Sequence, residues 1–312
     1  MPEARVAFVG TDQFAVASLL ALHNTREINL AAVASSPPKP SGRGMKLRPS
    51  PVAQQAEELG IPVTLPQDDK ELAQTVTGCK ADFLVVCAYG RKLGAASLNS
   101  PGSGCVNVHS SLLPRWRGAA PIERAIIAGD SKIGVSTMLI CEKMDAGDIL
   151  LQHELTVPAD ATGGQMRILL AQEGARLLID TLLRFASIKP LPQDKTQVTY
   201  APKIQKQETF LDLARTAEEL ARVVRAFAPM PAARLIANGN PLKILSAQAI
   251  SGTGRPGELI CATEKSGLVL ATGSGCLKLL EVQPADRKPM AVAEFLRGCR
   301  GKLEIVQVDK NT

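Results

Sequence analysis

The chain lacks a long apolar run. Its longest strongly apolar stretch, from Phe83 to Tyr89, is far shorter than the roughly 20 residues that a membrane-spanning helix needs. The first residues carry an acid and no leading basic cluster, which favours the first strand of a domain over a signal peptide. With 45% hydrophobic and 21% charged residues among 312, the composition excludes wholesale disorder and is typical of about two globular domains.

Paired cysteine motifs are also missing. The seven cysteines form an odd number, contain no Cys-x-x-Cys, and include several inside apolar runs, where a free thiol behaves as a small hydrophobe. This pattern favours a reducing cytoplasm over a disulfide framework and argues against a zinc site, so we expect a cytoplasmic protein without metal. No Gly-x-Gly-x-x-Gly follows the first apolar run, so dinucleotide binding is not indicated.

Charge is distributed unevenly along the chain. The net charge is +6, but residues 1–188 carry 18 basic and 18 acidic side chains and are neutral. Residues 189–312 therefore hold the whole excess. A basic second half indicates a polyanionic partner. A charge that merely keeps a small domain in solution is an equally open alternative.

The first half alternates between strand and helix patterns. An apolar run at 6–9, an amphipathic stretch at 12–22 and a second apolar run at 28–34 predict a βαβ unit with parallel pairing. Ser50 and Pro51 predict the start of a helix that ends before Gly60, and Thr162 with Gln165 forms the start of a long helix to about residue 185. Further strands are expected at 82–87, 105–109 and 135–140, and further helices at 68–77 and 122–128.

Three other segments lack this regular alternation of strand and helix patterns. Residues 35–51 contain five prolines, two glycines and four cations without an acid, which predicts a mobile basic loop with no sheet or helix partner. Residues 189–207 are rich in proline and lysine without a period, and we interpret them as an interdomain linker. Residues 208–312 hold one helix at 216–227 and several short runs separated by turns. They predict a small β-barrel, for which the OB type is one candidate.

Of the three histidines, His109 has the neighbouring residues most suited to catalysis. It ends an expected strand two residues after Asn107, so both side chains point to one face, at the edge where parallel sheets bind ligands. The loop that follows holds the only tryptophan, and Asp145 follows the next strand. An amide and an imidazole can stabilise an oxyanion while a carboxylate orients the imidazole or a water, which suits acyl transfer. The alternative is a structural histidine at a strand end.

These residues resemble the methionyl-tRNA formyltransferases, a branch of the 10-formyltetrahydrofolate-dependent formyltransferases. The Asn107-x-His109 pair with Asp145 is common to the wider family, and the run Leu112-Leu113-Pro114-Arg115-Trp116-Arg117-Gly118-Ala119-Ala120-Pro121 is narrower. Similar segments lie at 40–47, 86–90, 198–204 and 284–290, so the resemblance covers nearly the whole chain. The chain departs from the family pattern at Asp12, which replaces a proline, at Ala146, which replaces a threonine, and at Leu213 and Met230, which replace tryptophans.

The resemblance implies a fold and an activity. The fold would be an α/β, Rossmann-like catalytic domain at 1–188 with a mostly parallel sheet, a linker at 189–207 and an OB-like tRNA-binding barrel at 208–312. The reaction would move the formyl group of 10-formyltetrahydrofolate to the α-amine of methionyl-initiator tRNA in translation initiation. The partners would be that tRNA and the folate co-substrate, and the enzyme would be a monomer with no metal and no membrane contact.

The resemblance also implies roles for individual residues. Asn107 would donate a hydrogen bond to the oxyanion, and His109, held by Asp145, would be the second donor and the proton shuttle. The folate would be held by Ser111, Leu112, Leu113, Pro114, Ala88, Tyr89 and Gly90. The tRNA would be contacted by Arg43, Lys46, Lys203 and Lys206, with the loop at 35–51 closing over the acceptor end.

Three other functions remain open on sequence grounds. One is formyl transfer to a small amine such as a purine precursor or an amino sugar, which needs no basic second domain. Another is a formyltetrahydrofolate hydrolase, which would resemble the catalytic half only. The third is a non-catalytic RNA-binding protein, against which the presence of Asn107, His109 and Asp145 argues.

Overall fold

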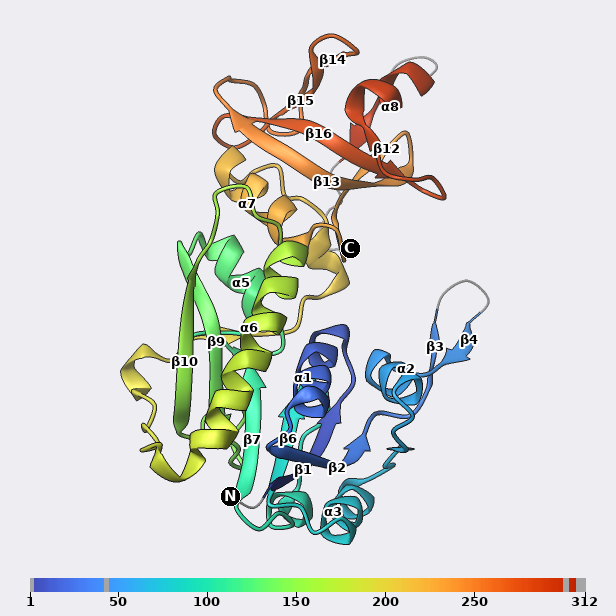
Figure 1. Cartoon of the computed structure of the whole chain (residues 1–312). Coiled ribbons are helices and arrows are strands. Elements are labelled where there is room, and N and C mark those ends of the chain that lie inside the picture. The colour runs from blue at the N-terminus through green and yellow to red at the C-terminus, as the bar shows by residue number, and fades with distance from the viewer. Residues whose placement is uncertain (1–2, 42–44, 300–302, 307–312) are drawn as a thin grey trace. The chain divides into compact units, whose positions relative to one another are not determined.

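The computed structural model describes residues 3–41, 45–299 and 303–306 (Figure 1). The chain forms two compact units. The first comprises Met1–Pro121, Lys132–Leu155 and Arg167–Ala201, and the second comprises Ile122–Ser131, Thr156–Met166 and Pro202–Thr312. Two short segments of the first half thus cluster with the second unit. The domain boundaries that composition places at 188 and 207 stay a prediction.

The first unit is built on a seven-stranded sheet whose strands are mostly parallel, as expected. The exception is β9, which runs antiparallel to β7. In sheet order the strands are β10 (Ile149–Thr156), β9 (Lys132–Leu139), β7 (Gly104–His109), β6 (Phe83–Cys87), β1 (Ala4–Gly10), β2 (Ile28–Ala34) and β5 (Val63–Thr64). The strand order reverses between β1 and β6, which is where open α/β sheets bind ligands beyond their carboxyl ends.

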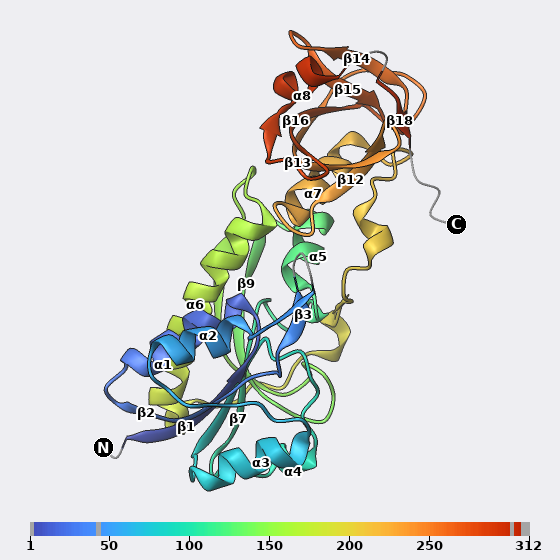
Figure 2. The same ribbon diagram turned by 90° about the vertical axis from the view of Figure 1, so that its right-hand side faces the viewer.

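Helices cover both faces of this sheet (Figures 1 and 2). They are α1 (Gln13–Asn24), α2 (Pro51–Glu58) and α6 (Gly163–Arg184) on one face, and α3 (Asp69–Gly78) and α4 (Ala95–Leu98) on the other. Gly174 brings α6 close to the sheet, because a Cβ at this position would lie 2.9 Å from Val108. Leu72 and Val76 of α3 pack with Ala7 and Val9 in the core on the opposite face.

The predicted helix starts are confirmed by their caps. The Ser50 hydroxyl accepts a hydrogen bond from the backbone N–H of Ala53 at 3.0 Å, and Pro51 occupies the first helical turn. Thr162 and Gln165 bond reciprocally: the Gln165 backbone N–H donates to Oγ1 of Thr162 at 3.2 Å, and the Thr162 N–H donates to Oε1 of Gln165 at 2.8 Å. These contacts are local in sequence, which explains why the sequence alone predicts them.

The basic loop forms strands, so the expectation that it has no sheet partner was wrong. β3 (Lys39–Ser41) pairs antiparallel with β4 (Lys46–Arg48), and Pro40 stands opposite Leu47. We call the two paired strands, Lys39–Ser41 and Lys46–Arg48, the basic hairpin. A two-stranded ribbon has two edges, so a proline that removes one N–H is tolerated there, whereas a central strand would exclude it. Arg43 lies outside the described residues.

The segment interpreted as a linker is attached to the first unit over much of its length. Leu191 forms a two-way backbone bridge with Ile149, with both N···O distances at 2.8 Å. Further on, β11 (Tyr200–Ala201) pairs in parallel with β8 (Arg117–Gly118). Short 3₁₀ helices lie at Lys195–Gln197 and Lys206–Thr209. These pairings join segments far apart in the sequence, so no local period announces them.

The second unit is a curved antiparallel sheet that nearly closes into a barrel (Figure 2), which confirms the expected small barrel. Its strands in order are β14 (Leu259–Thr263), β15 (Gly267–Ala271), β16 (Cys276–Pro284), β13 (Asn240–Ile250), β12 (Ala233–Ala237) and β18 (Ile305–Val306), with β17 (Met290–Ala291) beside β16. The unit also contains helices α5 (Pro121–Ala128), α7 (Ala217–Phe227) and α8 (Val292–Gly298).

Of the two tryptophan replacements, Leu213 is fully buried and Met230 is 82% exposed. Among the described residues, no helix has both the length and the apolar composition needed to cross a bilayer.

Candidate functional site

His109 is held at the carboxyl end of β7 with a defined tautomer. The side chain is only 7% exposed, and its Nε2 lies 3.0 Å from the carbonyl oxygen of Trp116. Because a carbonyl oxygen can only accept, Nε2 must carry the proton in this contact. The neutral imidazole therefore has its lone pair on Nδ1.

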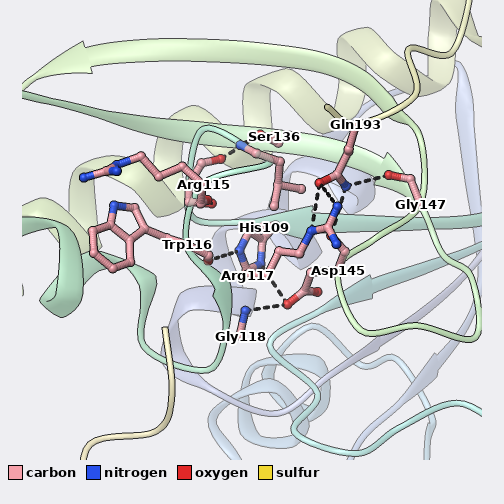
Figure 3. A network of polar contacts seen from close by, with 11 residues as sticks. His109, Arg115, Trp116, Arg117, Gly118, Ser136, Asp145, Gly147 and Gln193 are labelled. Carbon is pink, nitrogen blue, oxygen red and sulfur yellow. Dashed lines mark hydrogen bonds and ion pairs between the residues drawn. The ribbon is translucent and has the colours of Figure 1, made fainter. Parts of the chain in front are cut away.

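Asp145 faces that lone pair (Figure 3). Its Oδ2 lies 3.8 Å from Nδ1 of His109 and accepts a hydrogen bond of 2.8 Å from the backbone N–H of Gly118. The 3.8 Å separation is too long for a direct hydrogen bond and is one that a bridging water can span. The structure thus brings together two predicted residues that are separated by 36 positions in the sequence.

Asn107 shares the face of β7 on which His109 lies. The two are separated by one residue of the strand, so their side chains project to the same side. Asn107 is half-buried, and none of the hydrogen bonds found in the described part of the chain involves its carboxamide. The NH₂ group is therefore available as a donor to a substrate oxygen.

The predicted folate loop, residues 111–114, is braced by the neighbouring strands. The buried Ser136 hydroxyl on β9 donates to the carbonyl of Ser111 at 2.6 Å and accepts from the N–H of Leu113 at 3.2 Å. From β10, Nε2 of Gln152 donates to the Leu113 carbonyl at 2.9 Å. The Leu113 side chain packs against Met138 in a small core, so the group of this residue left for a ligand is the second lone pair of its backbone carbonyl.

Residues 88–90 form the turn after β6, where the strand order reverses. Ala88 has a φ of 43°, and its carbonyl accepts from the backbone N–H groups of Thr11 at 3.2 Å and Asp12 at 3.3 Å. A proline at position 12 could not make the second of these bonds, so Asp12 ties the two turns in a way the usual residue would not. Ala88 and Gly90 are exposed, whereas the Tyr89 side chain turns into the core. Contact with a ligand through the backbone is compatible with this arrangement.

Gln193 is a site residue that the sequence reasoning missed. Its Oε1 accepts from Nε and Nη2 of Arg117 at 3.0 and 2.8 Å, and its Nε2 donates to the carbonyls of Asp145 at 2.9 Å and Gly147 at 2.7 Å (Figure 3). No spacing signals this role, because the residue lies in a segment without periodicity.

A cysteine on the strand that carries the site is excluded as a nucleophile. Cys105, on the same strand as His109, is 5% exposed, and burial raises the pKa of its thiol to about 12. The thiolate required for nucleophilic attack is therefore absent at neutral pH. Within the described residues, no group of three or more His, Cys, Asp or Glu side chains converges as a metal site would require.

The predicted tRNA contacts are described for three of their four residues. Lys46 is exposed on the basic hairpin, and Lys203 and Lys206 are exposed beyond β11. Lys46 belongs to the first unit and the other two belong to the second. Their role in binding stays a prediction.

Comparisons with known proteins identify the family. The formyl transferase family model matches residues 4–182, and the model of the formyl transferase C-terminal domain matches residues 203–300. A methionyl-tRNA formyltransferase of Magnetococcus marinus is 44% identical over 299 residues, covering 94% of this chain and 95% of that protein. Its counterpart in Paracoccus denitrificans is 41% identical and covers 94% and 97%.

A solved structure shares the fold at much lower identity. HypX from Aquifex aeolicus in complex with tetrahydrofolic acid is 17% identical with a TM-score of 0.65, and the match covers 94% of this chain and 47% of that one. The chain thus spans about half the length of HypX. With both domain models in chain order and curated relatives matched nearly end to end, the chain belongs to the family of methionyl-tRNA formyltransferases.

Proposed function

We propose that the chain transfers the formyl group of 10-formyltetrahydrofolate to the α-amine of methionine esterified to initiator tRNA. The observation that carries the proposal is the His109–Asp145 pair beside Asn107 at the carboxyl edge of the first sheet. It occurs in a chain that is 44% identical to a methionyl-tRNA formyltransferase.

The chemical step needs an oxyanion stabiliser more than it needs a nucleophilic side chain. The neutral α-amine attacks the formyl carbon, a C–N bond forms, and negative charge develops on the formyl oxygen. The NH₂ of Asn107 donates to that oxygen. Collapse of the tetrahedral intermediate then breaks the bond to N10 of the folate, so no covalent enzyme intermediate is required.

His109 moves the proton from the amine to the leaving group. With Nε2–H held on Trp116, the lone pair of Nδ1 accepts the proton that the attacking amine releases. The imidazolium donates that proton to N10 as the C–N bond to the folate breaks, so N10 leaves as a neutral amine and the oxyanion becomes the carbonyl of the new formamide. The Asp145 carboxylate at 3.8 Å stabilises the transient positive charge.

The tRNA is bound through the cations. Residues 189–312 carry the excess positive charge, and Lys203 and Lys206 are exposed there, while Lys46 and Arg43 belong to residues 35–51. Binding through several phosphates releases counterions and is strongly salt-dependent. We assign the enzyme to the cytoplasm, in keeping with seven free cysteines, all of which lie in the described residues. We propose in addition that it acts as a monomer.

Mass measurement tests the proposal directly. Purified protein with 10-formyltetrahydrofolate and methionyl-tRNA should yield N-formylmethionyl-tRNA. Parallel reactions should contain an amino-sugar nucleotide, a small purine-precursor amine, or water alone. Formylation of a small amine at a rate equal to that of the tRNA, or folate deformylation without an acceptor, would refute the proposed substrate.

A further inference from the structure

Gln193 is a buried amide whose hydrogen-bonding capacity is fully used. Its side chain is 9% exposed, and its oxygen accepts two bonds from Arg117 while its nitrogen donates two, to the carbonyls of Asp145 and Gly147. A primary amide has two donor hydrogens and two acceptor lone pairs, so none remains for a substrate. Gln193 therefore acts on its neighbours and not on the reacting atoms.

The donor half of Gln193 holds an unusual turn. Asp145 has a φ of 50°, the left-handed region that residues other than glycine rarely occupy. A residue keeps such a conformation where several contacts with its surroundings hold it there. The Gln193 nitrogen bridges the carbonyls on either side of Ala146, and a Cβ on Gly147 would collide with the carbonyl oxygen of Leu139. The turn is thus clamped from two sides with the Asp145 carboxylate directed at His109.

The acceptor half holds the opposite wall of the site. Gln193 binds the Arg117 side chain, the next residue Gly118 donates its N–H to the Asp145 carboxylate, and the Asp145 carbonyl accepts from Gln193. These contacts form a closed ring. The residue before Arg117 is Trp116, whose carbonyl holds Nε2 of His109. Both members of the 3.8 Å pair are therefore anchored to one segment that Gln193 locks to the Asp145 turn.

We propose that Gln193 is a positioning residue for formyl transfer, which sets the separation between Nδ1 of His109 and the Asp145 carboxylate. The inference rests on the catalytic roles proposed above for these two residues. It also gives a function to the segment that the sequence marked only as a linker.

The substitution Gln193→Glu removes the donor half of the amide and keeps the acceptor half. The carboxylate keeps the shape and the bonds to Arg117, but it has no N–H for the carbonyls of Asp145 and Gly147 and repels them. Gln74→Glu is the matched control, because it makes the same change in the first unit at an exposed side chain of α3. Misplacement of reacting groups by about 1 Å can lower turnover by about 10²-fold.

Steady-state kinetics with methionyl-tRNA and 10-formyltetrahydrofolate give the first measurement. We expect Gln193→Glu to lower kcat by roughly 10–100-fold while KM for both substrates stays within about threefold. Gln74→Glu should match the wild type. A kcat within threefold of wild type for Gln193→Glu, or a loss confined to KM, would overturn the proposal.

Nitrogen NMR of the histidine rings gives a second measurement that a general loss of stability would not reproduce. The chain has only three histidines, so ¹⁵N labelling of the imidazoles yields a readable spectrum. Gln193→Glu should shift the ring nitrogens of His109 and leave those of His23 and His153 in place. Unchanged His109 signals would overturn the positioning role whatever the kinetics. If Gln193→Glu does not fold, Gln193→Asn, which is one methylene too short to reach both sides, is judged by the same criteria.

The two proposals fail in different ways. If the wild-type protein does not formylate methionyl-tRNA, the proposed function is wrong, yet the nitrogen spectra still report whether Gln193 holds His109. If the wild type is active and Gln193→Glu is unimpaired, only the positioning role is wrong.

Discussion

Two segments that the sequence marks as functional differ in whether their polar groups are hydrogen-bonded within the protein or exposed. In the segment from His109 to Gly118, side chains and backbone are hydrogen-bonded to β9, to β10, to Asp145 and to Gln193. In the basic hairpin, Lys46, Leu47 and Arg48 are exposed. Groups that stabilise a transition state are effective when they are fixed in advance. Cations that bind phosphates remain hydrated until the polyanion displaces their counterions.

We expect the largest effect from removing the two side chains proposed to act in the reaction, His109 and Asp145. His109→Ala and Asp145→Ala should each lower turnover by roughly 10²–10³-fold, because each removes part of the oxyanion and proton-transfer apparatus. Binding of methionyl-tRNA, measured by filter binding, should stay close to wild type. Near-normal turnover in both variants would contradict the catalytic assignment.

For the loop of residues 35–51 we expect the opposite pattern, in which a substitution weakens tRNA binding. Arg43→Ala should raise KM for methionyl-tRNA by about tenfold and reduce the salt dependence of binding by about one unit of slope, with the KM for folate unchanged. Arg43→Lys should restore only part of the loss, since lysine offers a point charge without a planar face. The exposed Arg26→Ala serves as the control.

Two tRNAs decide what the loop recognises. One has an open first base pair in its acceptor stem and the other has that pair closed. Arg43→Ala should impair use of the open tRNA more. An equal and small effect on both would mean that the loop supplies only electrostatic attraction.

Ser136→Ala tests whether the folate loop is held by β9. The substitution leaves the N–H of Leu113 and the carbonyl of Ser111 without their buried partner, which costs about 1–3 kcal/mol of unfolding free energy. KM for 10-formyltetrahydrofolate should rise several-fold, and KM for tRNA should not change. Urea denaturation measures the first effect, and Ser131→Ala, at an exposed position before the same strand, should leave both unchanged.

The smallest expected effect lies in the second unit, at the start of α7. The pKa of Glu219 is lowered to about 2, first by the hydrogen bond from Arg215 and then by the backbone N–H of Thr216, which is 3.0 Å away. A carboxyl whose folded-state pKa is depressed stabilises the fold above its unfolded value near 4.5 and loses that contribution as pH falls toward 2.

The corresponding variant is Glu219→Gln, which should be less stable by about 1 kcal/mol or less at pH 7, since the group is largely solvated. The difference from wild type should shrink between pH 5 and 2 in denaturant titrations. A difference that does not vary with pH would contradict the role of the charge. Glu218→Gln, in the same helical turn, is the control.

The expected and observed secondary structures agree where the cause is local. The cap at Ser50 and the reciprocal bonds of Thr162 and Gln165 join residues three positions apart, and the shared face of Asn107 and His109 follows from strand geometry. Such features depend on neighbouring residues only, so the amino-acid sequence by itself determined them. The resemblance of the motifs also predicts that Asp145 belongs to the same site.

Other features were decided by the tertiary structure. The 3.8 Å contact of His109 with Asp145 and the clamp formed by Gln193 each join segments whose proximity depends on the order of strands in the sheet. The left-handed backbone of Asp145 is stable because those distant partners hold it. A sequence pattern encodes which residues prefer a strand or a helix, but the distance between two side chains tens of positions apart is set only when the sheet has formed and its loops have packed.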